Sequence, residues 1–242
     1  LDVHHVSRTS LDQLHETIKD ALNNPHKYII RKQPLDGAQR TAHFLYRAHG
    51  LQSIKVRLTT LCNLNCDMCS WVKKTEMIET KQVRQAIETA ALLGVRHINF
   101  TGGEPSIYPD FLDVVQKAKH HNLAISLSTN GAYPQQHLKR FINDLSYVDI
   151  SIDSADANKH NAIREGNRAL QQTIQTVKTC AHYGIKPHIN VTVRPDNIQG
   201  LHDIVDLLAP HIRSISYTLV DNSLLHLKHL DICHQDLDNF YF

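Results

Sequence analysis

The stretch IKVRLTTLCNLNCDMC, residues 54–69, joins an apolar segment to three closely spaced cysteines. Ile54 to Leu61 has the composition of a β-strand, and Cys62, Cys66 and Cys69 follow it directly. Thiolates are the usual ligands of iron-sulfur clusters, and a cubane cluster normally takes four of them. Three cysteines on one tight loop leave one iron open to a ligand that is not protein, which predicts a catalytic 4Fe-4S cluster.

The residues between the cysteines suit such a loop. Asn63 and Asn65 tolerate turn conformations, and Leu64 and Met68 supply apolar cover. The alternative interpretation is a zinc knuckle completed by one of the 18 histidines. Zinc sites more often repeat a C-x2-C pair or end in a spaced histidine pair, and neither pattern is completed convincingly here.

A second motif, TGGEP at residues 101–105, follows another short apolar strand, His97 to Phe100. Two adjacent glycines let a ligand approach the backbone closely. Taken alone, this motif is typical of an ordinary turn. Its position one strand-helix unit beyond the cysteines makes it more informative than an isolated turn motif.

This pair of motifs resembles the signature of the radical S-adenosylmethionine (SAM) superfamily. The resemblance runs from about Ile54 to Leu219 and continues through the stretches STNG (128–131), DISIDS (149–154) and IREGNR (163–168). It is greatest toward the branch that contains the molybdenum-cofactor cyclases and the peptide-modifying maturases. It implies a partial barrel of parallel strands as the fold.

Strand-like and helix-like segments alternate from Ile54 onward, which independently predicts an α/β protein with a parallel sheet. The expected strands are 54–60, 96–101, 124–129, 147–152, 186–193 and 214–219. The expected helices are Thr80 to Leu93, Asp110 to His121, Pro134 to Asp144, Ala169 to Tyr183 and Leu201 to Leu208. Six units fall short of the eight in a closed barrel, so we expect an open, partial (β/α)6 barrel.

We expect three parts in the chain. Residues 1–50 read as an N-terminal helical extension, residues 51–220 as the barrel, and residues 221–242 as a C-terminal tail packed on it. Functional groups of parallel sheets gather at the carboxyl ends of the strands. The cysteine loop and the three later polar motifs all fall at such ends, so we expect them to share one rim.

The resemblance also implies the cofactors, a 4Fe-4S cluster and SAM. Cys62, Cys66 and Cys69 would hold three irons, and SAM would chelate the fourth. Arg168 matches the position of an arginine that pairs with the SAM carboxylate in several relatives, with Arg164 as the weaker candidate. The remaining residues expected to bind SAM are Gly102, Gly103 and Glu104 for its amino group, Ser128 and Ser151 for its ribose or carboxylate, and Asn130, Asp153 and Met68.

Composition excludes several other classes of protein. The formal net charge of +2 comes without clustered basic residues, so nucleic acid is not an expected partner. No apolar run is long enough to cross a bilayer. Outside the motif only Cys180 and Cys233 remain, which makes no disulfide framework and predicts a single cluster in a reducing cytoplasm.

The substrate is the least determined feature. Radical chemistry on a small molecule or cofactor precursor is favoured by the short chain and single cluster. The same chemistry on a ribosomally made peptide, and a non-catalytic iron-sulfur or zinc scaffold, are the alternatives. The resemblance adds an electron donor such as flavodoxin or ferredoxin as a partner. Barrel-end residues that we expect near the substrate are Asn190, Arg194, Tyr217 and Asn222.

Overall fold

The computed structural model describes residues 51–69 and 75–220. Within them lies one sheet of six parallel strands, in which each strand pairs with its neighbour in sequence. The strands are β1 (Ser53–Thr59), β2 (His97–Gly102), β3 (Ala124–Thr129), β4 (Tyr147–Ser151), β5 (His188–Val193) and β6 (Ser214–Leu219). β1 and β6 lie at the two edges and do not pair with each other, so the barrel is partial and open, as predicted.

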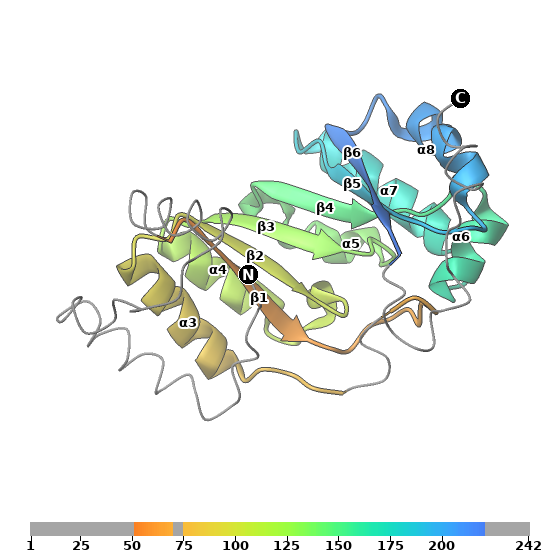
Figure 1. Cartoon of the computed structure of the whole chain (residues 1–242). Coiled ribbons are helices and arrows are strands. Elements are labelled where there is room, and N and C mark those ends of the chain that lie inside the picture. The colour runs from red at the N-terminus through yellow and green to blue at the C-terminus, as the bar shows by residue number, and fades with distance from the viewer. Residues whose placement is uncertain (1–50, 70–74, 221–242) are drawn as a thin grey trace, which may run out of the picture.

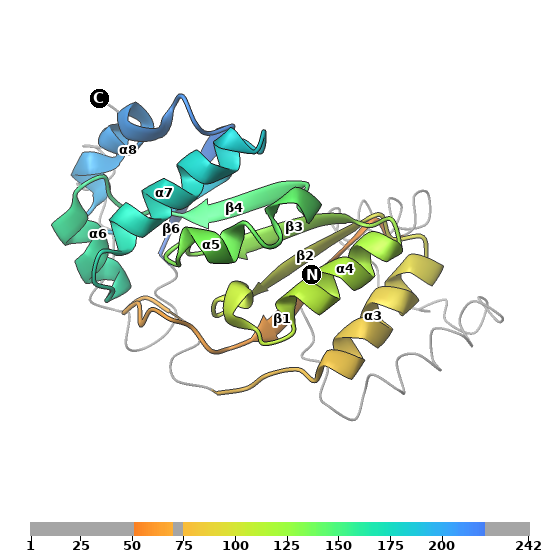
Figure 2. The ribbon, with the colours of Figure 1, turned by 180° about the vertical axis from the view of Figure 1, so that it is seen from behind.

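The described helices cover one face of this sheet. Figure 2 shows α3, α4, α5 and α7 in front of the strands, whereas Figure 1 looks onto the opposite face, which none of these four helices covers. The α-helices are α3 (Thr80–Leu92), α4 (Phe111–His120), α5 (Gln135–Leu138), α6 (Ala157–Arg164), α7 (Ala169–His182) and α8 (Leu201–Leu208). Short 3-10 turns are η2 (Pro105–Ile107), η3 (Ile142–Asp144) and η4 (Ile198–Gly200).

The alternation of side chains along each strand builds the core. Successive strand residues point to opposite faces, so every second residue meets the helices. The helix-facing residues of the strands are almost all apolar and buried, and they include Leu58, Ile98, Phe100, Ile125, Leu127, Val148, Ile150, Ile189 and Val191. They pack against apolar helix residues such as Val83, Ile87, Val114, Val177 and Ile204. This pattern fixes which face of the sheet remains open for a ligand.

Several predicted boundaries agree with the structure and others differ for physical reasons. β3, β6 and α8 have the predicted limits. The predicted strand 186–193 begins only at His188, because Pro187 has no N–H to donate to the sheet. The predicted helix 134–144 is divided into α5 and η3, because Phe141 leaves the helical region with a φ of −136°. Its ring then packs edge-on against Phe111.

The sequence reading missed helix α6. Eight residues, mostly polar, give it little apolar periodicity, and its start depends on a cap: the Asp156 carboxylate accepts hydrogen bonds from the N–H groups of Asn158 and Lys159. The expectations for residues 1–50 and 221–242 lie outside the described residues, and the division into three parts stays a prediction. Among the described helices, none combines the length and apolar character that crossing a membrane requires.

Candidate active site

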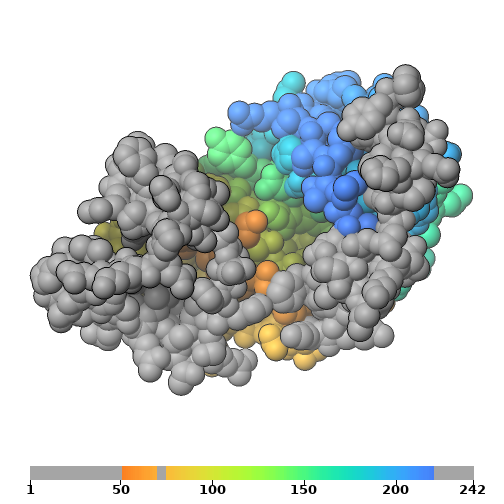
Figure 3. Space-filling view, viewed as in Figure 1, coloured from red at the N-terminus to blue at the C-terminus, as the bar shows by residue number. Residues whose placement is uncertain are grey.

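A cavity of about 370 Å³ lies at the carboxyl ends of the strands. The space-filling view shows the surface hollowed over the middle of the sheet, beside the blue residues of β6 (Figure 3). Residues from the cysteine loop and from the ends of β2, β3, β4 and β5 line the cavity; they include Cys62, Met68, Cys69, Gly102, Gly103, Ser128, Asn130, Ser151, Arg164 and Asn190. Residues brought from distant parts of the sequence therefore meet at one rim.

The cysteine loop is a compact turn. The Cys69 N–H donates to the Cys66 carbonyl at 3.1 Å, and the Leu64 N–H donates to the Cys62 sulfur at 3.4 Å. All three cysteines are free thiols, and all three line the cavity. In the part of the chain that the structure describes, no three such side chains converge as they would around a single metal ion. The thiolates of a cubane cluster bind different irons, so their sulfurs need not converge.

Asn63 ties this loop to the end of β3. Its Nδ2 donates to the Ala132 carbonyl at 2.7 Å, and its Oδ1 accepts from Nδ2 of Asn130 at 2.8 Å. The same Asn130 nitrogen lies 3.5 Å from the Cys62 sulfur, where it donates a hydrogen bond. Asn63 and Asn130 therefore hold the cysteine loop against the end of β3.

The two glycines are required by the close approach of two backbones. The Gly103 N–H donates to the Thr59 carbonyl at 2.7 Å, and the Glu104 N–H donates to the Leu61 carbonyl at 2.8 Å. A Cβ on Gly103 would lie 2.1 Å from the Leu61 oxygen, and a Cβ on Gly102 would lie 2.3 Å from the Thr59 oxygen. Because these neighbours are backbone atoms, no larger residue fits there without a shift of the chain.

Glu104 is fully buried behind the cavity and does not line it. Its carboxylate accepts hydrogen bonds from the Ser106 N–H at 3.1 Å, and from the Thr129 hydroxyl and the Asn130 N–H at 2.8 Å. Burial raises the pKa of this carboxyl group, and the three donors oppose that shift. In this structure the side chain of Glu104 joins the end of β2 to the end of β3.

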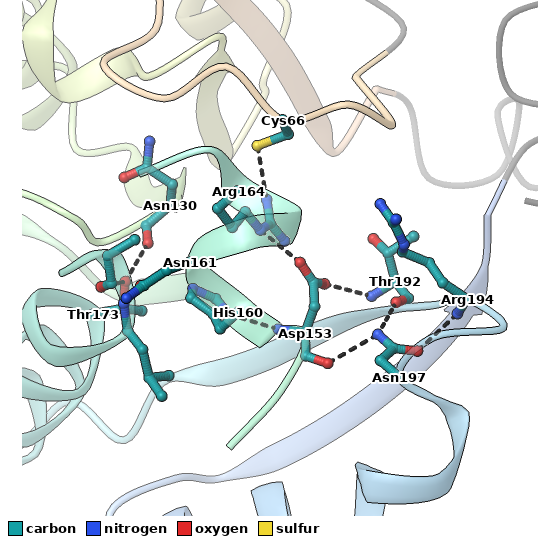
Figure 4. A network of polar contacts seen from close by, with 12 residues as sticks. Cys66, Asn130, Asp153, His160, Asn161, Arg164, Thr173, Thr192, Arg194 and Asn197 are labelled. Atoms are coloured by element: carbon teal, nitrogen blue, oxygen red, sulfur yellow. Dashed lines mark hydrogen bonds and ion pairs between the residues drawn. The ribbon is translucent and has the colours of Figure 1, made fainter. Parts of the chain in front are cut away.

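Arg164 is the cationic side chain that contacts a cysteine sulfur in the described part of the chain. Its Nη1 donates to the Cys66 sulfur at 3.8 Å, and its Nε lies 2.6 Å from Oδ2 of Asp153, as Figure 4 shows. Burial opposes the charge on Arg164, but the Asp153 carboxylate and the Cys66 sulfur raise its pKa above the ordinary value. Burial also raises the pKa of the Cys66 thiol, and Arg164 opposes this. Arg164 is therefore a permanent cation beside the thiol.

The expected site residues divide into three groups. The cavity brings together the three cysteines with Met68, Gly102, Gly103, Ser128, Asn130, Ser151 and Arg164. Glu104 and Asp153 are buried behind it and hold other site residues. Arg168 is exposed and does not line the cavity, and its Nε donates to Oε1 of Gln171 at 3.1 Å.

Several lining residues were not among the expected cofactor ligands, and two of them lie on strands β4 and β5. Asp149 and Asn190 both face the cavity, from β4 and β5. Asp149 lies two residues before Ser151, so the two-residue period of a strand places both on the same face. That period was the signal that would have identified Asp149 from the sequence.

The remaining barrel-end expectations have different outcomes. Arg194 is 3% exposed and lines a second cavity, together with Asp67 and Asp196. The Tyr217 hydroxyl donates to the Leu201 carbonyl at 3.5 Å. Asn222 lies outside the described residues.

The sheet face opposite the described helices is polar from β2 to β6. His97, Asn99, Ser126, Ser128 and Asp149 form a hydrogen-bonded series across β2, β3 and β4. His188, Asn190 and Ser216 continue it across β5 and β6. Closed eight-stranded barrels usually fill these positions with branched apolar side chains. The open face therefore offers hydrogen bonds to a ligand.

Comparisons with known proteins agree with this geometry. A family model described as the radical SAM superfamily matches residues 56–208. The mycofactocin maturase MftC of Mycobacterium ulcerans is 30% identical over 168 residues, which cover 66% of this chain and 45% of the relative. The GTP 3',8-cyclase of Aquifex aeolicus is 25% identical over 181 residues, which cover 70% of this chain and 55% of the relative.

Among solved structures, Streptococcus suis SuiB bound to S-adenosylmethionine has a similar fold. The TM-score is 0.67 at 15% identity, and the match covers 96% of this chain and 57% of SuiB. The chain spans about half the length of the relatives that it matches. Because the family model covers well over half of the chain, the protein belongs to the radical SAM superfamily, whose enzymes use a 4Fe-4S cluster and S-adenosylmethionine.

Proposed function

We propose that the chain cleaves SAM reductively at a 4Fe-4S cluster held by Cys62, Cys66 and Cys69, and acts on a polar small molecule or cofactor precursor. The observation that carries this proposal is that three thiols, a glycine-lined backbone and the Arg164 guanidinium all line one cavity. When bound, the reduced cluster supplies SAM with one electron, which yields methionine and a 5'-deoxyadenosyl radical.

The donor set around the cavity fits this cofactor pair. The three thiols leave one iron open, and the polar groups beside them suit the amino acid part of SAM. The backbone at Gly102 and Gly103 admits a ligand without a side chain in the way. Ser128, Asn130 and Ser151 supply hydrogen bonds to the ribose or carboxylate, and Met68 supplies apolar contact to the adenine.

We assign the SAM carboxylate to Arg164 and not to Arg168. Arg164 lines the cavity with one nitrogen held at Cys66, and its remaining N–H groups suit a carboxylate. Arg168 is exposed, and the αL conformation at its backbone, with a φ of 62°, places it at the start of α7. Asp153 then acts through Arg164, because its buried carboxylate fixes the guanidinium.

The polar open face supports a substrate rich in hydrogen-bonding groups. Asp149 is half-buried, and the contact found for it among the described residues is the Ser128 hydroxyl at 3.4 Å. A half-buried carboxylate with one long hydrogen bond favours a hydroxyl, amide or ammonium group as its partner. Asn190 presents a side-chain amide to the same cavity.

A peptide substrate is the second candidate. MftC is named as a maturase, and another solved structure of SuiB is described as bound to the precursor peptide SuiA. Backbone amides of a peptide would also suit Asp149 and Asn190.

An external electron donor such as flavodoxin or ferredoxin completes the proposal, because the cluster must be reduced before each cleavage.

The first experiment is anaerobic cluster reconstitution, reduction with dithionite and detection of 5'-deoxyadenosine by mass spectrometry after SAM is added. We expect the wild type to form it. Cys66→Ala should lose both the cluster spectrum and the product while the protein stays soluble. Cys180→Ala is the matched control, because Cys180 is buried in α7 and does not line the cavity. An intact cluster that neither binds nor cleaves SAM would support the scaffold alternative.

The arginine assignment is tested by SAM affinity. Arg164→Lys should weaken SAM binding by about tenfold, because an ammonium cannot make the paired contact of a guanidinium. Arg168→Lys makes the same change outside the cavity and should leave the affinity within about twofold. Equal losses would contradict the assignment.

The substrate class is tested by deuterium transfer. Extracts from cells grown in deuterated medium are separated into small molecules and peptides, and each fraction is incubated with the reduced enzyme and SAM. Deuterium in 5'-deoxyadenosine from the small-molecule fraction, insensitive to peptidase, is the expected result. Transfer that peptidase abolishes would favour the peptide alternative.

A further inference from the structure

Among the described residues, Arg194 makes the charged contact to the cysteine loop that spans the most sequence. It follows directly after β5, and its side chain is only 4% exposed. Its Nη1 and Nη2 both donate to the Asp67 carboxylate, the second at 2.9 Å, across 127 residues of sequence. Its Nε and Nη2 also donate to the Asp196 carboxylate, both at 2.9 Å. Arg194 is buried, whereas the Asp67 side chain is 33% exposed. The bidentate contact adds both geometric specificity and strength to an arginine-carboxylate pair.

Asp67 lies inside the turn that carries two of the three cysteines. It follows Cys66 and precedes Met68 and Cys69. The other side-chain tethers described for the loop act at or before Cys66: Asn63 contacts Ala132, Asn65 contacts Glu165, and Arg164 contacts the Cys66 sulfur. Among the described contacts, that of Asp67 is therefore the side-chain tether that follows Cys66 in the loop.

The pair faces away from the SAM cavity. Neither Asp67 nor Arg194 lines that cavity, and both line a second one of about 300 Å³, together with Lys159, Ala162, Ile163 and Asp196. Arg194 therefore contacts the cysteine loop from behind. Its described contacts therefore reach the cysteine loop and not the cavity assigned to SAM.

Arg194 belongs to the same polar network as Arg164, as Figure 4 shows. Its backbone N–H donates to Oδ1 of Asn197 at 2.8 Å, and Nδ2 of Asn197 donates to the Asp153 carbonyl at 2.9 Å. Asp153 holds Arg164, which donates to the Cys66 sulfur. Two arginines thus reach neighbouring residues of the loop, Cys66 and Asp67, from one buried centre.

We infer that Arg194 is a positioning residue, which holds the Cys66 to Cys69 turn in its cluster-binding conformation through Asp67. This inference rests on the cluster assigned in the proposed function, but not on SAM cleavage or on the substrate. Contacts outside the ligand set commonly change metal affinity by about 10-fold to 100-fold, because they orient the ligands.

The test compares two isosteric substitutions. Asp67→Asn and Asp196→Asn each remove one carboxylate charge from Arg194, but only Asp67 belongs to the cysteine loop. We expect Asp67→Asn to speed the loss of iron from the reconstituted cluster to a chelator by about tenfold. Asp196→Asn should change that rate by less than about twofold. Arg194→Lys should be intermediate, because lysine keeps the charge and loses the bidentate contact.

A second readout needs no cluster. Backbone amide hydrogen exchange of residues 62–69 in the apoprotein should accelerate in Asp67→Asn and stay unchanged in Asp196→Asn. Equal iron loss in the two variants, or faster iron loss without faster exchange in residues 62–69, would overturn the inference. If the wild type forms a cluster that neither binds nor cleaves SAM, the proposed function fails, and the two readouts still decide the role of Arg194.

Discussion

The two flanks of the cavity are held in different ways. Near β1 and β2, backbone packs on backbone: Gly102 and Gly103 lie against Thr59 and Leu61 with no space for a methyl group. Near β4 and β5, charged side chains hold the site through the Asp153 to Arg164 pair and the Asp67 to Arg194 pair. We therefore expect the first flank to be sensitive to changes of shape and the second to changes of charge.

This difference matches what each flank contacts. Gly102 and Gly103 border the cavity with main chain alone, so their backbone can approach a ligand directly. The charged flank surrounds the thiol of Cys66, where the electrostatic environment affects an iron-sulfur cluster. Substitutions that separate shape from charge therefore test the comparison, and four of them follow in order of expected effect.

The largest effect is expected from Arg164→Met on the charged flank. Methionine keeps much of the volume but leaves the fully buried Asp153 carboxylate without its cation. Breaking a buried pair by removing one partner costs about 3–5 kcal/mol. Urea unfolding of the apoprotein measures this loss. The double variant Arg164→Met with Asp153→Asn should recover part of it, and a loss below about 1 kcal/mol would show that charge does not hold this flank.

Gly103→Ala tests the flank held by shape. Its new Cβ would lie 2.1 Å from the Leu61 oxygen, so the β1 end must shift away from β2. Overpacking of this kind costs about 1–3 kcal/mol, and we expect the upper end because the neighbours are backbone atoms. Gly200→Ala is the control, since the nearest atom to its Cβ is 3.6 Å away. Similar unfolding midpoints for both variants would contradict the steric argument.

His160, which contacts Asp153 of the charged flank, should make the stability of the folded protein depend on pH. Its Nδ1 accepts the Asp153 N–H at 3.2 Å, and burial together with the Arg164 charge lowers its pKa from 6.5 to about 4. The unfolded chain therefore takes up this proton before the folded protein does. Stability should fall as the pH drops from about 6.5 toward 4, by about 2 kcal/mol between pH 7 and pH 5.

Unfolding of the apoprotein across that range measures the slope. His160→Asn keeps an acceptor for the Asp153 N–H and should lose most of the contribution. The exposed His202 gives the matched control, because His202→Asn should keep the wild-type slope. A wild-type slope in His160→Asn would mean that another group carries the pH dependence.

The sequence predicted the local features of this site and missed the long-range ones. Cysteine spacing, the glycine pair and the alternation of strands and helices are local patterns, and they located the cysteines and glycines that line the cavity. The family resemblance added the lining residues Ser128, Asn130, Ser151 and Arg164. Asp67 and Arg194 are 127 residues apart, and no local pattern indicates their pairing. The two-residue period of the strand places Asp149 on the same face as Ser151, but Asp149 was not among the predicted site residues.

Which of the two arginines is the better candidate for the SAM carboxylate also depends on tertiary structure. Arg164 and Arg168 lie four residues apart, so a regular helix would place both on one face. Helix α6 instead ends at Arg164, and Glu165 takes a left-handed conformation with a φ of 47°. The chain then turns before α7, which removes Arg168 from the cavity. Helix α6, which the sequence analysis did not predict, is therefore the reason that Arg164 replaces Arg168 as the candidate.

The smallest effect is expected at the junction of the two flanks, where Thr129 donates to Glu104. Thr176 is a close match, because each threonine hydroxyl is buried, donates to one group and accepts from another. Thr176 donates to a neutral carbonyl, that of Gly131, at 2.8 Å. A hydrogen bond to a charged group contributes about 1.5–3 kcal/mol, and a neutral one about 0.5–1.5 kcal/mol.

Thr129→Val should therefore destabilise the protein by about 1 kcal/mol more than Thr176→Val at neutral pH, measured by urea unfolding. The excess depends on an ionised Glu104, and burial raises the pKa of that carboxyl group. Equal losses in the two variants would mean that the proton stays on Glu104. The joint between β2 and β3 would then be held by shape and neutral hydrogen bonds, and charge would be confined to the β4 and β5 side of the cavity.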